Sequence, residues 1–129
     1  MRQLSFGSLE RRGDICILPI SGRLVSGLHD LQLRRKTQEV KDLDCRKLVA
    51  DIRALESIGS SGISFFVELY TSVTKRPNGR FVLAGPSERV REVLEITRLT
   101  TILTLADDID SALAWCAETD TAARASGSR

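Results

Sequence analysis

The chain has 129 residues, about the size of one domain and too small for two ordinary ones. Its 19 Lys and Arg residues nearly balance 17 Asp and Glu residues, and a net charge of +2 argues against a nucleic-acid-binding surface of clustered basic residues. The longest apolar runs, such as residues 15–20, are far shorter than the roughly 20 residues that cross a bilayer. The first residues lack the apolar core of a secretion signal, so we expect a small cytoplasmic domain with no membrane insertion.

The N-terminal segment predicts two adjacent strands. Residues 4–9 predict the first strand, residues 11–14 a turn and residues 15–20 a second strand. The second strand is apolar on both faces, as expected of a strand covered by helices. Because Pro19 lacks an N–H, we expect part of this strand to have an unpaired or bulged side.

A helix and a third strand are predicted next. Residues 27–43 are rich in charge and have apolar residues at roughly helical spacing, and residues 47–52 predict a strand. Leu33 falls outside the predicted apolar stripe of the helix. That stripe consists of Leu28, Leu31, Val40 and Leu43.

The clearest helix of the chain follows a turn predicted at residues 57–62. Residues 77–79 end this helix, and residues 80–84 predict the next strand. Its apolar positions recur at the spacing of one helical face, and they are Ile63, Phe66, Val67, Tyr70 and Val73.

The C-terminal part predicts two more helices and a strand. Ser87 is placed to cap a helix, residues 102–105 predict the last strand, and Asp107 and Asp108 precede a final helix. Residues 119–129 are small and polar and predict a flexible tail behind a domain of residues 1–118. The alternation of strands and helices predicts an α/β fold, with a central, mostly parallel or mixed sheet of about five strands and about four helices.

The titratable residues do not predict a metal site, a cofactor site or a catalytic centre. The single histidine, His29, and the three cysteines are too far apart for zinc spacing. Cys16 and Cys116 fall at apolar positions and predict small core side chains, whereas Cys45 falls in a loop beside Arg46. An odd number of widely spaced cysteines favours a reducing compartment over a disulfide framework.

The segment Gly59-Ser60-Ser61-Gly62 opens the clearest helix. It lacks the second glycine of a nucleophile elbow and the Gly-Lys-Ser/Thr of a phosphate-binding loop, and no suitably placed histidine accompanies it. From these residues alone, Ser60 or Ser61 is expected to cap the helix.

Three segments together resemble the STAS domain family. Residues 48–63 are similar to its signature, which reads Asp-Ser-Ser-Gly or Asp-Ser-Thr-Gly in bacterial anti-sigma-factor antagonists. Residues 20–24 resemble the Gly-Glu-Leu-Asp segment of the family, and residues 87–99 resemble its third helix and the following turn. The resemblance covers about residues 4–117 and implies a single STAS-like domain that is not an enzyme.

The resemblance implies partner switching. An unmodified antagonist binds an anti-sigma factor that is also a serine kinase, phosphorylation releases it, and a serine phosphatase restores it. The implied phosphorylation site is Ser60, with Ser61 as second candidate, and the implied partner-binding residues are Gly59, Ser60, Ser61 and Gly62.

Gly59 stands where the motif has Asp. Relatives without a normal acceptor motif imply an alternative function, a non-phosphorylated STAS scaffold or an accessory subunit of a lipid-transport complex. No cofactor is implied in either case, and a homodimer is compatible with both.

Leu33, Ile96 and Trp115 lie outside the apolar stripes of their predicted helices. For Trp115 two interpretations are open. Its large ring either packs along a groove or belongs to a binding or dimerisation surface, in which tryptophan is enriched.

Overall fold

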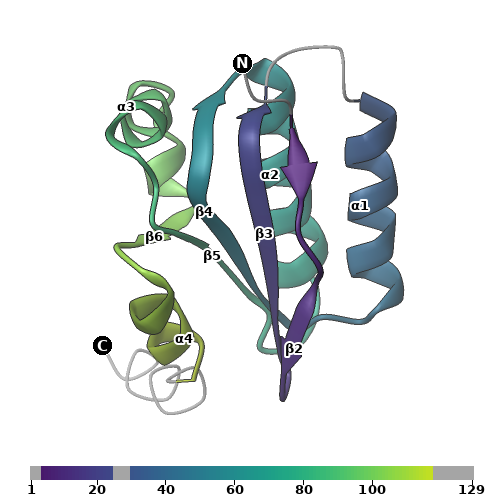
Figure 1. Ribbon diagram of the computed structural model, residues 1–129. Helices are drawn as coiled ribbons and strands as arrows, with labels where there is room; N and C mark the ends of the chain where they lie inside the picture. Colours follow the sequence, from purple (N-terminus) through teal and green to yellow (C-terminus); the bar gives the residue numbers. More distant parts are fainter. Residues whose placement is uncertain (1–3, 25–29, 118–129) are drawn as a thin grey trace.

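The computed structural model describes residues 4–24 and 30–117. Predictions on Leu28, His29 and the tail 119–129 therefore lie outside the described residues. In the described part the strands and helices alternate as predicted (Figure 1). The strands are β1 (Ser5–Phe6), β2 (Glu10–Arg12), β3 (Ile15–Leu24), β4 (Lys47–Ile58), β5 (Arg80–Ala84) and β6 (Thr104–Ala106). The helices are α1 (Asp30–Asp42), α2 (Ser60–Thr74), α3 (Glu88–Ile96), the 3₁₀ turn η1 (Leu99–Thr101) and α4 (Ile109–Ala117).

One mixed sheet forms the centre of the fold. Its order is β1-β3-β4-β5-β6, with β2 also paired to β3. The strands β3, β4, β5 and β6 are parallel, and the short β1 and β2 run antiparallel to β3. The α/β class and the mostly parallel, mixed sheet are therefore confirmed.

The sheet has six strands rather than five, because residues 10–12 form a further strand, β2, where the sequence predicts the start of the turn 11–14, and the predicted first strand 4–9 is reduced to β1. β1 pairs with β3 at Ile20 and Ser21, and β2 pairs with it at residues 15–17. Opposite the gap between them lies Pro19, which cannot donate to the ladder and instead accepts from the Gly7 N–H at 3.0 Å. The β3–β4 register also shifts between Pro19 and Ser21, as the missing N–H predicts.

Helices cover both faces of the sheet, with α1 and α2 on one side and α3 and α4 on the other (Figure 1). The larger core cluster includes Leu18 of β3, Leu48 of β4 and Phe66 of α2. A second cluster joins Ile17 and Val49 to Ala112 and Cys116 of α4. Strand β3 is thus buried on both faces, as its sequence predicts.

The predicted apolar stripe of α1 is confirmed at Val40 but wrong at Leu31 and Leu43, which are exposed. Leu33, Thr37 and Val40 are buried, whereas Leu31 is 62% exposed. Positions 33, 37 and 40 are four and three residues apart, which places them on one helical face. The Thr37 hydroxyl donates to the Leu33 carbonyl oxygen at 2.9 Å, so a polar residue is satisfied in a core position that the apolar pattern overlooks.

Strand β4 is longer than its prediction, which ended at residue 52. Its parallel pairing with β3 continues past the end of β5, to Arg23 beside Ser57 and Leu24 beside Ile58. Residues 57 and 58 therefore lie in a strand, and the predicted turn shortens to Gly59 before α2 begins.

Both predicted helix starts in the C-terminal half are confirmed. The Ser87 hydroxyl accepts from the Val90 N–H at 3.2 Å at the start of α3. The Asp108 carboxylate accepts from the Ser111 N–H at 2.7 Å at the start of α4, and this bond lowers the pKa of Asp108.

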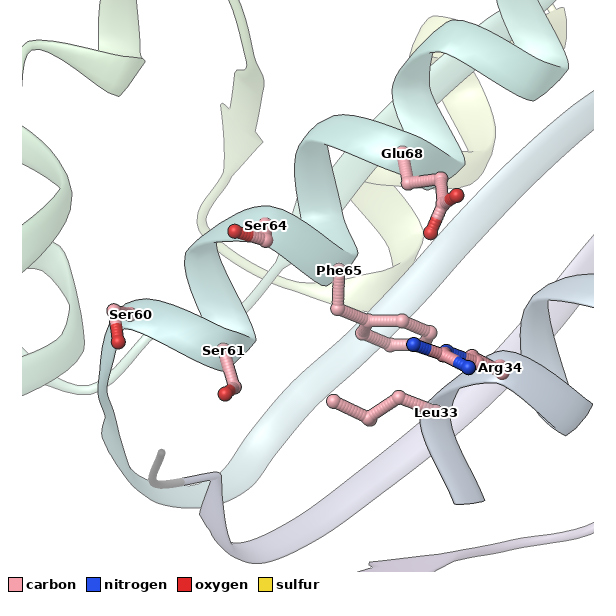
Figure 2. A pocket seen from close by; sticks show the side chains of 7 residues that line it. All are labelled: Leu33, Arg34, Ser60, Ser61, Ser64, Phe65 and Glu68. Carbon is pink, nitrogen blue, oxygen red and sulfur yellow. The ribbon is translucent and has the colours of Figure 1, made fainter. Parts of the chain in front are cut away.

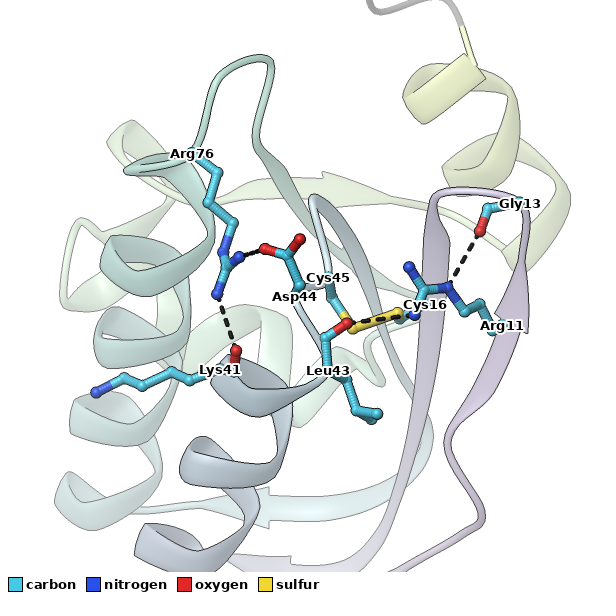
Figure 3. Close-up of a disulfide and its surroundings, with 8 residues drawn as sticks. All are labelled: Arg11, Gly13, Cys16, Lys41, Leu43, Asp44, Cys45 and Arg76. Atoms are coloured by element: carbon cyan, nitrogen blue, oxygen red, sulfur yellow. Dashed lines mark hydrogen bonds and ion pairs between the residues drawn. A yellow bond between two sulfur atoms is a disulfide. The ribbon is translucent and has the colours of Figure 1, made fainter.

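The prediction that Cys16 and Cys45 are unpaired is wrong, because a disulfide joins them (Figure 3). Cys45 lies in the loop between α1 and β4, as predicted, but is fully buried there. Two arginines hold the segment before it: Arg11 donates to the Leu43 carbonyl oxygen at 3.2 Å, and Arg76 forms an ion pair with Asp44. The long sequence separation of the two cysteines hid their proximity, which arises because β3 is adjacent to β4. Cys116 keeps its thiol in the core, and burial raises its pKa to about 11.

The disulfide predicts a thiol count that can be measured. Denatured without reductant, the protein should expose one thiol, that of Cys116, and with reductant it should expose three. Because the disulfide closes a loop with a sequence separation of 29 residues, reduction should lower the free energy of unfolding by about 3 kcal/mol in urea titrations. Three reactive thiols in the denatured, unreduced protein would contradict the pairing.

Candidate functional site

The segment from Gly59 to Gly62 lies at the N-terminus of a helix, as predicted. Gly59 is the N-cap of α2, and Ser60 is its first residue. The Gly59 N–H donates to the Leu24 carbonyl oxygen at 2.7 Å, and its own carbonyl oxygen accepts from the Ile63 N–H at 3.0 Å. The expectation that Ser60 or Ser61 occupies the cap position is therefore wrong, since the longer β4 delivers Gly59 there.

Gly62 brings the helix close to the sheet. It is buried, and a Cβ atom at this position would lie 2.6 Å from Ile58 Cγ1 and 2.8 Å from Leu24 Cγ. Both distances are too short for any side chain, so only glycine allows the first turn of α2 to rest on the ends of β3 and β4. Gly62 thus determines how close the turn that carries the two serines lies to the sheet.

The serines lie beside a groove between α1 and α2 (Figure 2). Its volume is about 320 Å³, with Leu33 and Arg34 on the α1 side. The α2 side consists of Ser60, Ser61, Ser64, Phe65 and Glu68. Ser60 is exposed and Ser61 is half-buried, so the first hydroxyl is accessible to an approaching protein.

Sequence reasoning did not single out Arg34, Phe65 or Glu68. A signal was present for the last two, because Ser61, Phe65 and Glu68 are four and three residues apart and share one helical face. The α2 stripe predicted through Ile63 and Phe66 omitted this face, which borders α1 and on which Phe65 is buried. Arg34 had no such signal, since its contribution depends on how two helices pack.

The three residues predicted outside the apolar stripes lie in three different environments. Leu33 belongs to the core, so it is not part of an exposed surface. The Trp115 ring is half-buried against the second core cluster, with the Arg80 guanidinium 4.4 Å from its centroid, which supports the groove-packing interpretation. Ile96 is 72% exposed.

Two patterns bear on metal binding and on membranes: a cluster of metal ligands and a membrane-spanning helix. Among residues 4–24 and 30–117, no three His, Cys, Asp or Glu side chains come together as metal ligands. Within the same ranges, no helix combines the length and apolar character needed to span a bilayer.

Comparison with known protein families shows to which family the chain belongs. A model of the STAS domain matches residues 8–112. The chain belongs to the STAS domain family. In sequence, this STAS domain is 37% identical over 67 residues to a candidate anti-sigma factor antagonist of Thermotoga neapolitana, named as a TM1081 homolog. That match covers 52% of this chain and 58% of the relative, so it spans little more than half of the relative's length.

Solved structures show the same fold. An anti-sigma factor antagonist from Mycobacterium paratuberculosis has a TM-score of 0.78 at 19% identity, over 88% of this chain and 94% of that chain. The anti-sigma factor antagonist SpoIIAA in its unphosphorylated form has a TM-score of 0.65 at 19% identity, over 79% and 88%. Its phosphorylated form, from Bacillus, has a TM-score of 0.59 at 20% identity, over 79% and 91%.

The cap position offers a test of the departure from the family motif. Gly59 has φ −117° and ψ −165°, an extended conformation that any residue adopts. Gly59→Asp should therefore raise stability, because a carboxylate at the N-cap accepts from the helix N–H groups, by roughly 0.3–1 kcal/mol. Gly59→Ala is the matched control and should not stabilise, since alanine is a poor N-cap. Thermal melts of the two variants measure the difference, and a lower melting temperature for Gly59→Asp than for Gly59→Ala would contradict the cap assignment.

Proposed function

We propose that this STAS domain is an anti-sigma-factor antagonist that binds an anti-sigma-factor kinase through the start of α2, and that phosphorylation of Ser60 controls the binding. The observation that carries the proposal is the accessible hydroxyl of Ser60 in the first turn of a helix, beside a groove. The names of the similar proteins support the class of function. The two forms of SpoIIAA support phosphorylation as its control.

The physical chemistry of the turn suits a switch. A phosphate on Ser60 adds about −1.5 to −2 charges, which the N–H groups at the start of α2 tolerate in the unbound protein. In a close-packed interface the same charge is taken out of water or placed against a partner, and this weakens binding. The modification thus alters the complex more than it alters the fold.

Ser60, Ser61 and Gly59 form the proposed contact surface, and Gly62 supports it from beneath. Phosphate is supplied by the kinase partner from ATP and removed by a serine phosphatase. The proposed place of action is the cytoplasm. In this function the domain binds and releases partners and catalyses no reaction.

One observation favours a second candidate. Gly59 offers no carboxylate at the position where the family motif has Asp. A STAS domain that lacks this group and is never phosphorylated would act as a scaffold or as an accessory subunit of a lipid-transport complex. Co-purification of the chain with an ATP-binding transport subunit would favour this alternative.

A binding assay with the partner kinase tests the switch. Ser60→Asp should weaken binding at least tenfold, or by about 1.4 kcal/mol, because it places a permanent charge in the interface. Ser60→Ala should bind normally and lose the phosphate that the kinase places at position 60, as located by mass spectrometry.

Ser111→Asp provides the matched control. It introduces the same change in the first turn of α4, on the opposite face of the sheet, and should leave kinase binding unchanged. Equal loss of binding in Ser60→Asp and Ser111→Asp would contradict the proposed surface. Absence of phosphate on both Ser60 and Ser61 after incubation with the kinase would replace the switch by the scaffold function.

A further inference from the structure

The two adjacent serines of the α2 turn face different surroundings. Ser61 shares its helical face with Phe65 and Glu68, and this face borders α1. Ser60 precedes it by about 100° around the helix and is exposed, whereas Ser61 is half-buried. Figure 2 shows the Ser61 side chain on the α1 side of the turn and Ser64, one turn after Ser60, pointing away from α1. Both serines thus line the groove, but Ser61 is half-buried on the side of α1, whereas Ser60 is exposed to solvent.

The wall of the groove opposite Ser61 carries one basic side chain from a run of three. Arg34 lines this groove together with Leu33 (Figure 2). Arg35 lies against another groove, between α1 and Phe6. Lys36 lines that other groove too and forms an ion pair with Glu39 at 2.8 Å. The packing of α1 therefore separates Arg34 from its two basic neighbours.

The floor of the groove is apolar. Phe65 is 3% exposed and Leu33 is 6% exposed, so both side chains belong to the packed core between α1 and α2. A charge in such a groove is screened less than one on an open surface, since core side chains exclude water from one side of it. Glu68 is the acidic group that lines the same groove.

We propose that Arg34 binds a phosphate carried by Ser61 and thereby bridges α1 and α2, whereas a phosphate on Ser60 stays on the exposed surface. The inference rests on the proposed phosphorylation of this turn, and it gives the turn two distinct modified states. In forming the second state, the γ-phosphoryl group of ATP is transferred to Ser61 Oγ, the hydroxyl proton leaves and ADP is released. The planar guanidinium donates two parallel hydrogen bonds to phosphate oxygens, a geometry that lysine does not offer.

The experiment uses the full chain with phosphoserine incorporated during translation at position 60 or at position 61, so that no kinase is needed. Phosphorus NMR follows the second ionisation of the phosphate as a function of pH. With the phosphate at position 61, Arg34→Gln should raise the titration midpoint by roughly 0.5 pH unit or more, because the cation that favours the dianion is lost. Glu68→Gln should lower the midpoint, because it removes a negative charge from the same groove.

Two controls make the result specific. Arg35→Gln, the same change one residue along α1, should leave the midpoint of phosphorylated Ser61 unchanged. With the phosphate at position 60, neither arginine variant should move the midpoint. Thermal melts confirm that each variant is folded, and Arg34→Lys provides a second variant that keeps the charge and should recover part of the shift.

Either of two results overturns the inference: a midpoint at position 61 that does not respond to Arg34→Gln, or an equal response at position 60. Its failure is separable from that of the proposed function. Phosphorylation of the turn by the kinase, together with no effect of Arg34, overturns this inference alone. An effect of Arg34 together with no phosphorylation by the kinase supports it and counts against the proposed function.

Discussion

The close approach of α2 to the ends of β3 and β4 is the constraint on which the candidate site depends. Gly62 permits it, because a side chain there would collide with Leu24 and Ile58. The contact requires β3 and β4 to stay paired to their last residues, well beyond the end of β5. Gly59 links β4 to α2: its N–H donates to the Leu24 carbonyl oxygen, and its own carbonyl oxygen accepts from the Ile63 N–H. The position of the serines thus depends on the backbone hydrogen bonds of Gly59 and on the absence of a side chain at position 62.

Local sequence patterns predicted the α/β class, the mixed sheet and the helix start at Gly59–Gly62, since turn residues and apolar periodicity report short-range structure. They failed where packing over long sequence distance decides. Thr37 is buried although it is polar, because its face of α1 packs into the core, and Arg34 lines the same groove as Ser61 because α1 packs beside α2. The pairing of Cys16 with Cys45 likewise follows from the position of β3 beside β4.

The disulfide favours an oxidising compartment, whereas the proposed partner is cytoplasmic, where thiols are normally kept reduced. Both cysteines are almost fully buried, at 1% and 0% exposed, so they pack as small core side chains whether or not they are joined. Whether the disulfide is oxidised or reduced therefore changes the stability of the protein mainly through the segment at the end of α1, near Cys45. The serines at the start of α2 share a groove with Arg34, which lies in the first half of α1, away from Cys45. The contact of Gly62 with the ends of β3 and β4 does not involve the disulfide.

Amide chemical-shift mapping during titration with the partner kinase shows where the partner binds. If it binds at the start of α2, the largest shifts fall on Gly59, Ser60, Ser61 and Ser64, with Arg34 beside them. The proposed switch also predicts that these shifts are lost when Ser60 is phosphorylated. A footprint centred instead on the exposed Ile96 and Ile102, with the α2 turn unperturbed, would contradict it.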